Sequence, residues 1–172
     1  MSAARAISGC LPSYNIMFSK QVVNFEIKHI FGAIIFLGNI TVGPFWKKHA
    51  ERSKDPKKIA DTFDGIIKAD RYFTMPGVTI LIVFGIGAAL HGGYNLITTA
   101  WIFWSLILVI ISGIAFMAKV VPIQKKILAL AQNEGEFNWN EYGKLAKQWD
   151  VWSSIATLAP YIALVLMVIR PA

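Results

Sequence analysis

Four long runs of apolar residues dominate the chain, and polar segments separate them. The runs cover roughly Val22–Trp46, Tyr72–Leu96, Thr99–Val121 and Val151–Ile169. A helix needs about 20 predominantly apolar residues to cross the hydrocarbon layer of a bilayer, and lipid leaves an irregular backbone without hydrogen-bond partners. The pattern therefore predicts an all-α fold: a polytopic membrane protein whose four-transmembrane-helix bundle continues into cytoplasmic helical extensions.

The lysines and arginines divide unevenly between the two sides of such a bundle. The segments between runs one and two and between runs three and four carry most of them: Lys47, Lys48, Arg52, Lys54, Lys57, Lys58, Lys68, Arg71, Lys119, Lys125, Lys126, Lys144 and Lys147. Basic residues accumulate on the cytoplasmic side, so we expect large cytoplasmic loops and both termini outside. The net charge of +7 then suits anionic lipid headgroups, and no nucleic-acid partner is expected.

Both basic loops show helical patterning. Asp55-Pro56 is a good helix start, and the apolar residues Ile59, Phe63, Ile66 and Ile67 recur at helical spacing after it, which predicts an amphipathic helix at the membrane interface. In the second loop Asn138 is positioned as a helix cap, with Glu141 three residues later. Its apolar face, Tyr142, Leu145, Trp149 and Trp152, is predicted to pack against an extension of helix three.

Residues 1–21 are predicted to be a flexible leader, and residues 22–172 form the four-helix domain. Ile7-Ser8-Gly9-Cys10 superficially resembles a lipoprotein cleavage site, but the apolar run of a signal peptide is missing. A second interpretation is that Met17 is the true start. Cys10 is the only cysteine, so an intramolecular disulfide is excluded and redox chemistry would need a bound cofactor.

Small and polar residues form one stripe along each of the first two predicted helices. The first stripe is His29, Gly32, Phe36, Asn39 and Gly43, and the second is Gly77, Ile80, Phe84, Gly87 and His91. Small residues let membrane helices approach closely, so these stripes are predicted to face each other. Asn39 has a simple interpretation as an interhelical hydrogen-bond donor, and Asp70-Arg71 as a local ion pair at the cytoplasmic boundary.

The two stripes place His29 and His91 in the same leaflet, because antiparallel helices bring the start of one beside the end of the other. Neutral imidazole is a common ligand of haem iron and of copper, and ionisable groups inside membranes are candidate functional groups. His29 and His91 are thus the candidate metal ligands, with Glu26 placed to orient the ring of His29. His91 has a second interpretation as a boundary residue facing headgroups. Gly32 and Trp101 are further candidate cofactor-binding residues, because Gly32 leaves space and Trp101 could line a ligand pocket. Lys28, Lys20 or Arg170 could pair with the propionate groups of a haem.

Three segments carry a resemblance to a known group: KHIFGAIIFLGNITVGPFW, ADRYFTMPGVTILIVFGIG and VIRPA. Through them the chain resembles a family of predicted integral membrane proteins related to the bacterial membrane-bound protoporphyrinogen IX oxidase and to the membrane domain of copper-resistance protein D. The resemblance implies a helix-one histidine that binds haem b, and His29 occupies that position. The oxidase has a lysine in helix three that is needed for activity, and TTAWIFWSLIL has no counterpart to it. The resemblance therefore supports haem binding more strongly than protoporphyrinogen oxidation.

Three hypotheses follow for a multi-pass protein of the bacterial inner membrane. The leading one is a membrane oxidoreductase that binds haem b and serves electron transfer or haem-related redox chemistry. Its partner would be a quinone, a membrane redox complex or a second copy of the chain. The second is a non-catalytic accessory or assembly subunit of a larger complex, with both histidines structural. The third is copper handling. Hydrolase chemistry has no support, because the sequence has no nucleophile elbow, phosphate loop or His-Glu-x-x-His segment.

Overall fold

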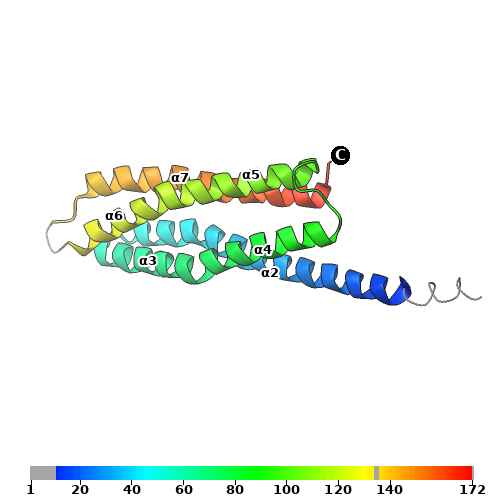
Figure 1. Cartoon of the computed structure of the whole chain (residues 1–172). Coiled ribbons are helices and arrows are strands. Elements are labelled where there is room, and N and C mark those ends of the chain that lie inside the picture. The colour runs from blue at the N-terminus through cyan, green and yellow to red at the C-terminus, as the bar shows by residue number, and fades with distance from the viewer. Residues whose placement is uncertain (1–10, 134–135, 172) are drawn as a thin grey trace, which may run out of the picture.

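The protein consists of four long helical segments, seen in a computed structural model that describes residues 11–133 and 136–171 (Figure 1). The elements are α2 (Leu11–Arg52), α3 (Pro56–Ala69), η1 (Asp70–Thr74), α4 (Met75–His91), α5 (Ala100–Ala115), η2 (Phe116–Val120), α6 (Val121–Gln132) and α7 (Trp139–Ile169). Four segments are long and apolar enough to cross a membrane: Lys20–Arg52, Pro56–His91, Ala100–Gln132 and Trp139–Ile169. The predicted all-α membrane fold is confirmed.

Two of these segments contain a π turn. The amide of Met75 donates to the carbonyl of Asp70 across η1, and the amide of Val121 donates to the carbonyl of Phe116 across η2. A proline follows each turn, at Pro76 and Pro122. Proline has no N–H and its ring clashes with the carbonyl four residues earlier, so a widened turn lets the helix pass without a break.

The helices pack as two antiparallel pairs, α2 with α4 and α5 with α7, which form the two layers of Figure 1. The pairs meet most closely where α3 packs on α6, at the end that carries the basic loops. We call this the loop end, and the opposite end, where α4 turns into α5, the turn end. The hydrophobic core clusters toward the loop end around Ile59, Phe63, Ile123, Ile127 and Trp149.

The core corrects one prediction and confirms another. Ile59 and Phe63 of α3 are fully buried, so α3 is not an interfacial helix with its apolar face in lipid; that face is covered by protein because α6 lies against it. Tyr142 and Trp149 of α7 are buried in the same core, as predicted. The expected caps also form, since Asp55 accepts from the amide of Lys57 and Asn138 accepts from the amide of Glu141.

The ends of the first two helices differ from the prediction. Helix α2 begins at Leu11, so the second half of the predicted flexible leader is helical, and α2 extends beyond the bundle at the turn end (Figure 1). The segment Ile7–Cys10 lies outside the described residues. Helix α4 ends at His91, five residues before the predicted Leu96, because Gly92 and Gly93 begin a turn there and Gly93 adopts a φ of 76°.

Candidate functional site

Glycines set the close contact between α2 and α4. A Cβ atom added to Gly32 would lie 2.6 Å from the amide nitrogen of Leu81, and one added to Gly77 would lie 3.0 Å from the amide nitrogen of Phe36. The two backbones therefore touch at Gly32 and Gly77, as the two predicted stripes require. The contact leaves no room for a planar macrocycle between these helices.

The imidazole of His29 is held against α4 by a specific hydrogen bond. Its Nδ1 lies 2.7 Å from the carbonyl oxygen of Leu81, and a Cβ atom on Gly85 would lie 2.6 Å from the same Nδ1. Because a carbonyl only accepts, Nδ1 donates this bond, and in a neutral ring the lone pair is then on Nε2. This is the arrangement in which a second group fixes the tautomer of a metal-binding histidine.

His91 lies at another level of the same helix pair. Its Nδ1 is 2.9 Å from the carbonyl oxygen of Gly87, and its ring stacks on Phe25 with centroids 4.8 Å apart. His29 packs on Gly85, six residues before His91, which is about 9 Å along a helix at 1.5 Å per residue. The prediction that the two histidines share one depth is wrong, because the helix contacts place His29 beside Gly85, between one and two turns before His91 on α4.

The two helix pairs leave a groove between them toward the turn end, and His29 lies in its wall. We call it the histidine groove; its volume is about 570 Å³, within the range of small-molecule sites. Aliphatic side chains of α2, α4, α5 and α7 make up most of the surface. The polar and aromatic lining residues are Glu26, His29, Tyr94, Trp101, Ser105, Tyr161 and Arg170. His91 is not among the described residues that line it.

The other predicted cofactor residues divide between this groove and the helix contact. Trp101 lines the groove, and the guanidinium of Arg170 lies 5.4 Å from the centre of its ring. Gly32 is buried against α4 rather than facing the groove. Lys28 lies over the ring of Phe84 at 4.9 Å, and Lys20 is exposed. Arg170 is thus the predicted propionate partner that the structure brings to the same groove as His29.

The carboxylate of Asp70 is buried at a second site, nearer the loop end. The sequence interpretation had placed it in an ion pair at the membrane boundary. Asp70 Oδ1 accepts from Asn39 Nδ2 at 3.2 Å and from Thr74 Oγ1 at 2.9 Å, while Oδ2 accepts from Gln124 Nε2 at 3.0 Å. Arg71 is exposed, and none of the ion pairs in the described part of the chain includes Asp70. The predicted Asp70–Arg71 pair is wrong, because side chains from α2 and α6 surround the carboxylate; the interhelical role of Asn39 is confirmed.

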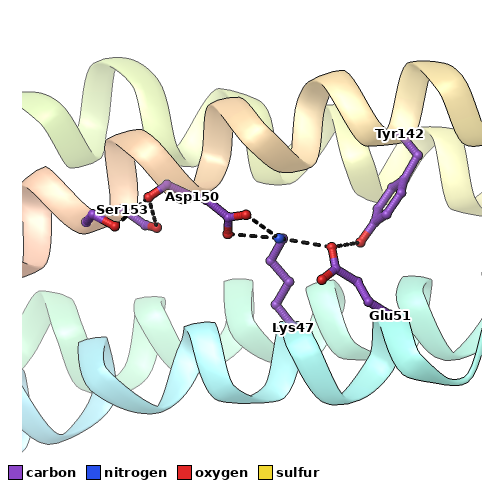
Figure 2. Close-up of polar contacts among 6 residues, drawn as sticks. Lys47, Glu51, Tyr142, Asp150 and Ser153 are labelled. Carbon is purple, nitrogen blue, oxygen red and sulfur yellow. Dashed lines mark hydrogen bonds and ion pairs between the residues drawn. The ribbon is translucent and has the colours of Figure 1, made fainter.

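A buried lysine links the two helix pairs at the loop end (Figure 2). Lys47 is 2% exposed, and its Nζ lies 2.8 and 2.9 Å from the two carboxylate oxygens of Asp150 and 2.9 Å from Oε1 of Glu51. The same Glu51 oxygen accepts from the hydroxyl of Tyr142 at 2.9 Å. No sequence pattern predicted this cluster, because Lys47 belongs to a run of basic residues that the membrane topology already explained.

A comparison with protein-family models settles the broad class of the protein. Residues 25–171 match a family described as "Predicted integral membrane protein (DUF2269)". The chain belongs to this family. Family membership and four helices of spanning length agree that the protein is embedded in a lipid bilayer. No curated protein and no solved structure matches the chain.

Proposed function

We propose that this member of the family is a haem b protein of electron transfer or haem-related redox chemistry, in which the histidine groove would hold the haem and His29 would bind its iron. The observation that carries the proposal is the hydrogen bond from His29 Nδ1 to the carbonyl of Leu81, which leaves Nε2 as the donor atom for a metal. Haem would supply one-electron chemistry; the chain would supply ligation, burial and orientation.

The groove suits a large, flat, mostly apolar group with an anionic edge. Its wall is predominantly aliphatic and is formed by α2, α4, α5 and α7. A ligand there would lie between the α2–α4 pair and the α5–α7 pair, and not between α2 and α4 themselves. Arg170 supplies a positive charge at the groove. The resemblance of His29 to the helix-one histidine of the membrane protoporphyrinogen oxidase supports the same cofactor.

The described residues offer less to the hypothesis of copper handling. No three His, Cys, Asp or Glu side chains gather within ion-binding distance in residues 11–133 and 136–171. His29 and His91 sit at different levels, with Phe25 stacked on His91. A single imidazole in an apolar groove suits a macrocycle, which would supply the other ligands of its metal itself.

Haem retention by histidine variants tests the proposal. Protein expressed with haem supplied and purified in mild detergent is expected to hold haem in the wild type and in the His91→Ala and His49→Ala variants, while His29→Ala loses it. Haem per chain is measured as the pyridine haemochrome, and matching elution on size exclusion shows that each variant is folded. Equal haem content in His29→Ala and the wild type would contradict the proposal and favour an accessory subunit with structural histidines.

We also propose that the loop end faces the cytoplasm of a bacterial inner membrane and that both termini face outward. Lysines and arginines from Lys47 to Lys58 lie on the C-terminal end of α2, on α3 and in the segment joining them, all at the loop end, where basic residues resist translocation. A phosphatase fused after Ala172 is expected to be active and a fluorescent protein at the same site dark, because only the phosphatase matures outside. The reverse pattern would contradict this orientation.

A further inference from the structure

The second cavity between the helix pairs has a chemistry of its own. We call it the acidic cavity: a space of about 660 Å³ beside Asp70, continuous in its lining with the histidine groove through Ile82 and Val109. Its charged lining residues are Asp61 and Asp70, and the described residues that line it include no Lys, Arg or His. Charged lining residues of acidic type alone are unexpected in a chain of net charge +7.

The carboxylate of Asp70 has capacity for one further donor. A carboxylate oxygen accepts about two hydrogen bonds; Oδ1 already has Asn39 and Thr74, and Oδ2 has Gln124 alone. All three donors are neutral, so none of these contacts compensates a negative charge on the carboxylate. A buried carboxylate is favoured in its ionised form when a partner of opposite sign lies beside it, so a cation is the occupant that would complete the contacts of Oδ2.

Aromatic residues form part of the wall, and one of them carries a buried donor without a partner. Phe36, Trp46, Phe116 and Trp149 line the cavity, and aromatic faces attract cations as well as apolar groups. Trp149 is 2% exposed, and its Nε1 is buried with no hydrogen-bond partner among the described residues. A buried N–H of this kind gains a bond from any acceptor atom placed beside it.

We propose that the acidic cavity binds a lipophilic organic cation: a molecule with a protonated amine that donates to Asp70 Oδ2, an apolar body against the aromatic wall, and an oxygen atom within reach of Trp149 Nε1. The lack of basic lining residues disfavours phosphate-bearing amphiphiles, whose anionic group would have no partner. The proposal is independent of haem binding at His29.

Paired probes of equal shape test the charge requirement. Full-length protein in nanodiscs of zwitterionic lipid is titrated calorimetrically with 2-(1-naphthyl)ethylamine and with 2-(1-naphthyl)ethanol, and empty nanodiscs give the background. The wild type is expected to bind the amine at least about tenfold more tightly than the alcohol, because only the amine neutralises a buried charge. Equal binding of the two, or tighter binding of the alcohol, would overturn the proposal in favour of a neutral ligand such as a hydroquinone.

Two variants assign the binding to this cavity. Asp70→Asn keeps the shape of the side chain and is expected to lose the preference for the amine, whereas Asp64→Asn, at a carboxylate paired with Lys68, keeps it. Gly113→Leu adds a side chain to the cavity wall at a position where a Cβ meets nothing within 4 Å, and it is expected to abolish binding. Gly38→Leu, equally open but outside the lining, is the control. Unchanged amine binding in Gly113→Leu would overturn the proposal even where Asp70→Asn does not fold.

Discussion

Replacing Lys47 with methionine is expected to lower the free energy of unfolding by about 2 kcal/mol. The ammonium group lies between Asp150 of α7 and Glu51 of α2 (Figure 2), so its loss removes an ionic link between the two helix pairs and leaves two carboxylates facing each other. Asp150 is half exposed and Glu51 is 30% exposed, which keeps the expected loss below that of a fully buried pair. The measurement is unfolding in mixed micelles of increasing sodium dodecyl sulfate, followed by circular dichroism.

Lys48 provides the matched control for this prediction. It is the next residue on the same helix, carries the same charge and is exposed, so Lys48→Met changes the basic loop end equally without touching the cluster. Its unfolding midpoint is expected to stay close to that of the wild type. Equal losses in Lys47→Met and Lys48→Met would show that the total charge of the loop end, rather than the Lys47 contacts, stabilises the protein.

Replacing Gly32 with leucine is expected to destabilise the protein by at least about 2 kcal/mol, the range of overpacked sites. A Cβ atom there would lie 2.6 Å from a backbone nitrogen and 3.0 Å from the carbonyl oxygen of Gly77, and backbone cannot move aside as a flexible side chain does. Helices α2 and α4 must therefore separate. The same micelle titration measures the loss, and disulfide crosslinking between α2 and α4 reports the separation.

Gly38 lies on the same helix, but a Cβ there meets nothing within 4 Å. Gly38→Leu is therefore expected to unfold at a midpoint near that of the wild type, and it adds the same apolar volume to the membrane-facing surface. If Gly32→Leu were as stable as Gly38→Leu, the close α2–α4 contact would not exist in the membrane.

Most of the architecture could be predicted from the sequence because it depends on periodicity and length. The four apolar runs gave the spans, and the glycine stripes gave the partner of α2, since small residues at helical spacing mark a close helix contact. The caps at Asp55 and Asn138 could be predicted because a helix cap depends only on residues within a few positions of the helix start. These features need no knowledge of which side chain meets which across the bundle.

The register between helices could not be predicted from the sequence. This register determines that His29 and His91 lie at different depths, and not at one depth as the sequence interpretation expected. Equal depth for His29 and His91 assumed that each histidine sits equally far inside the membrane boundary. The actual register follows from the contacts at Gly32, Gly77 and Gly85. These contacts place Phe25 opposite His91, so His29 lines the groove without His91 beside it.

The buried polar residues were missed for a different reason. Lys47 and Asp70 belong to segments rich in exposed charges, and a sequence pattern does not show which member of such a run turns inward. Each is buried because another helix supplies partners: Asp150 for Lys47 and Gln124 for Asp70. The π turn at Asp70–Thr74 also rotates the helix locally, which a regular helical period cannot anticipate.

The reduced-minus-oxidised absorption spectrum of the purified wild-type protein tests the central claim, a haem b held by His29, most directly. With haem supplied during expression, a Soret band and an α band of a b-type haem are expected, and both should be absent from His29→Ala purified in parallel. A wild-type spectrum with neither band would contradict the account.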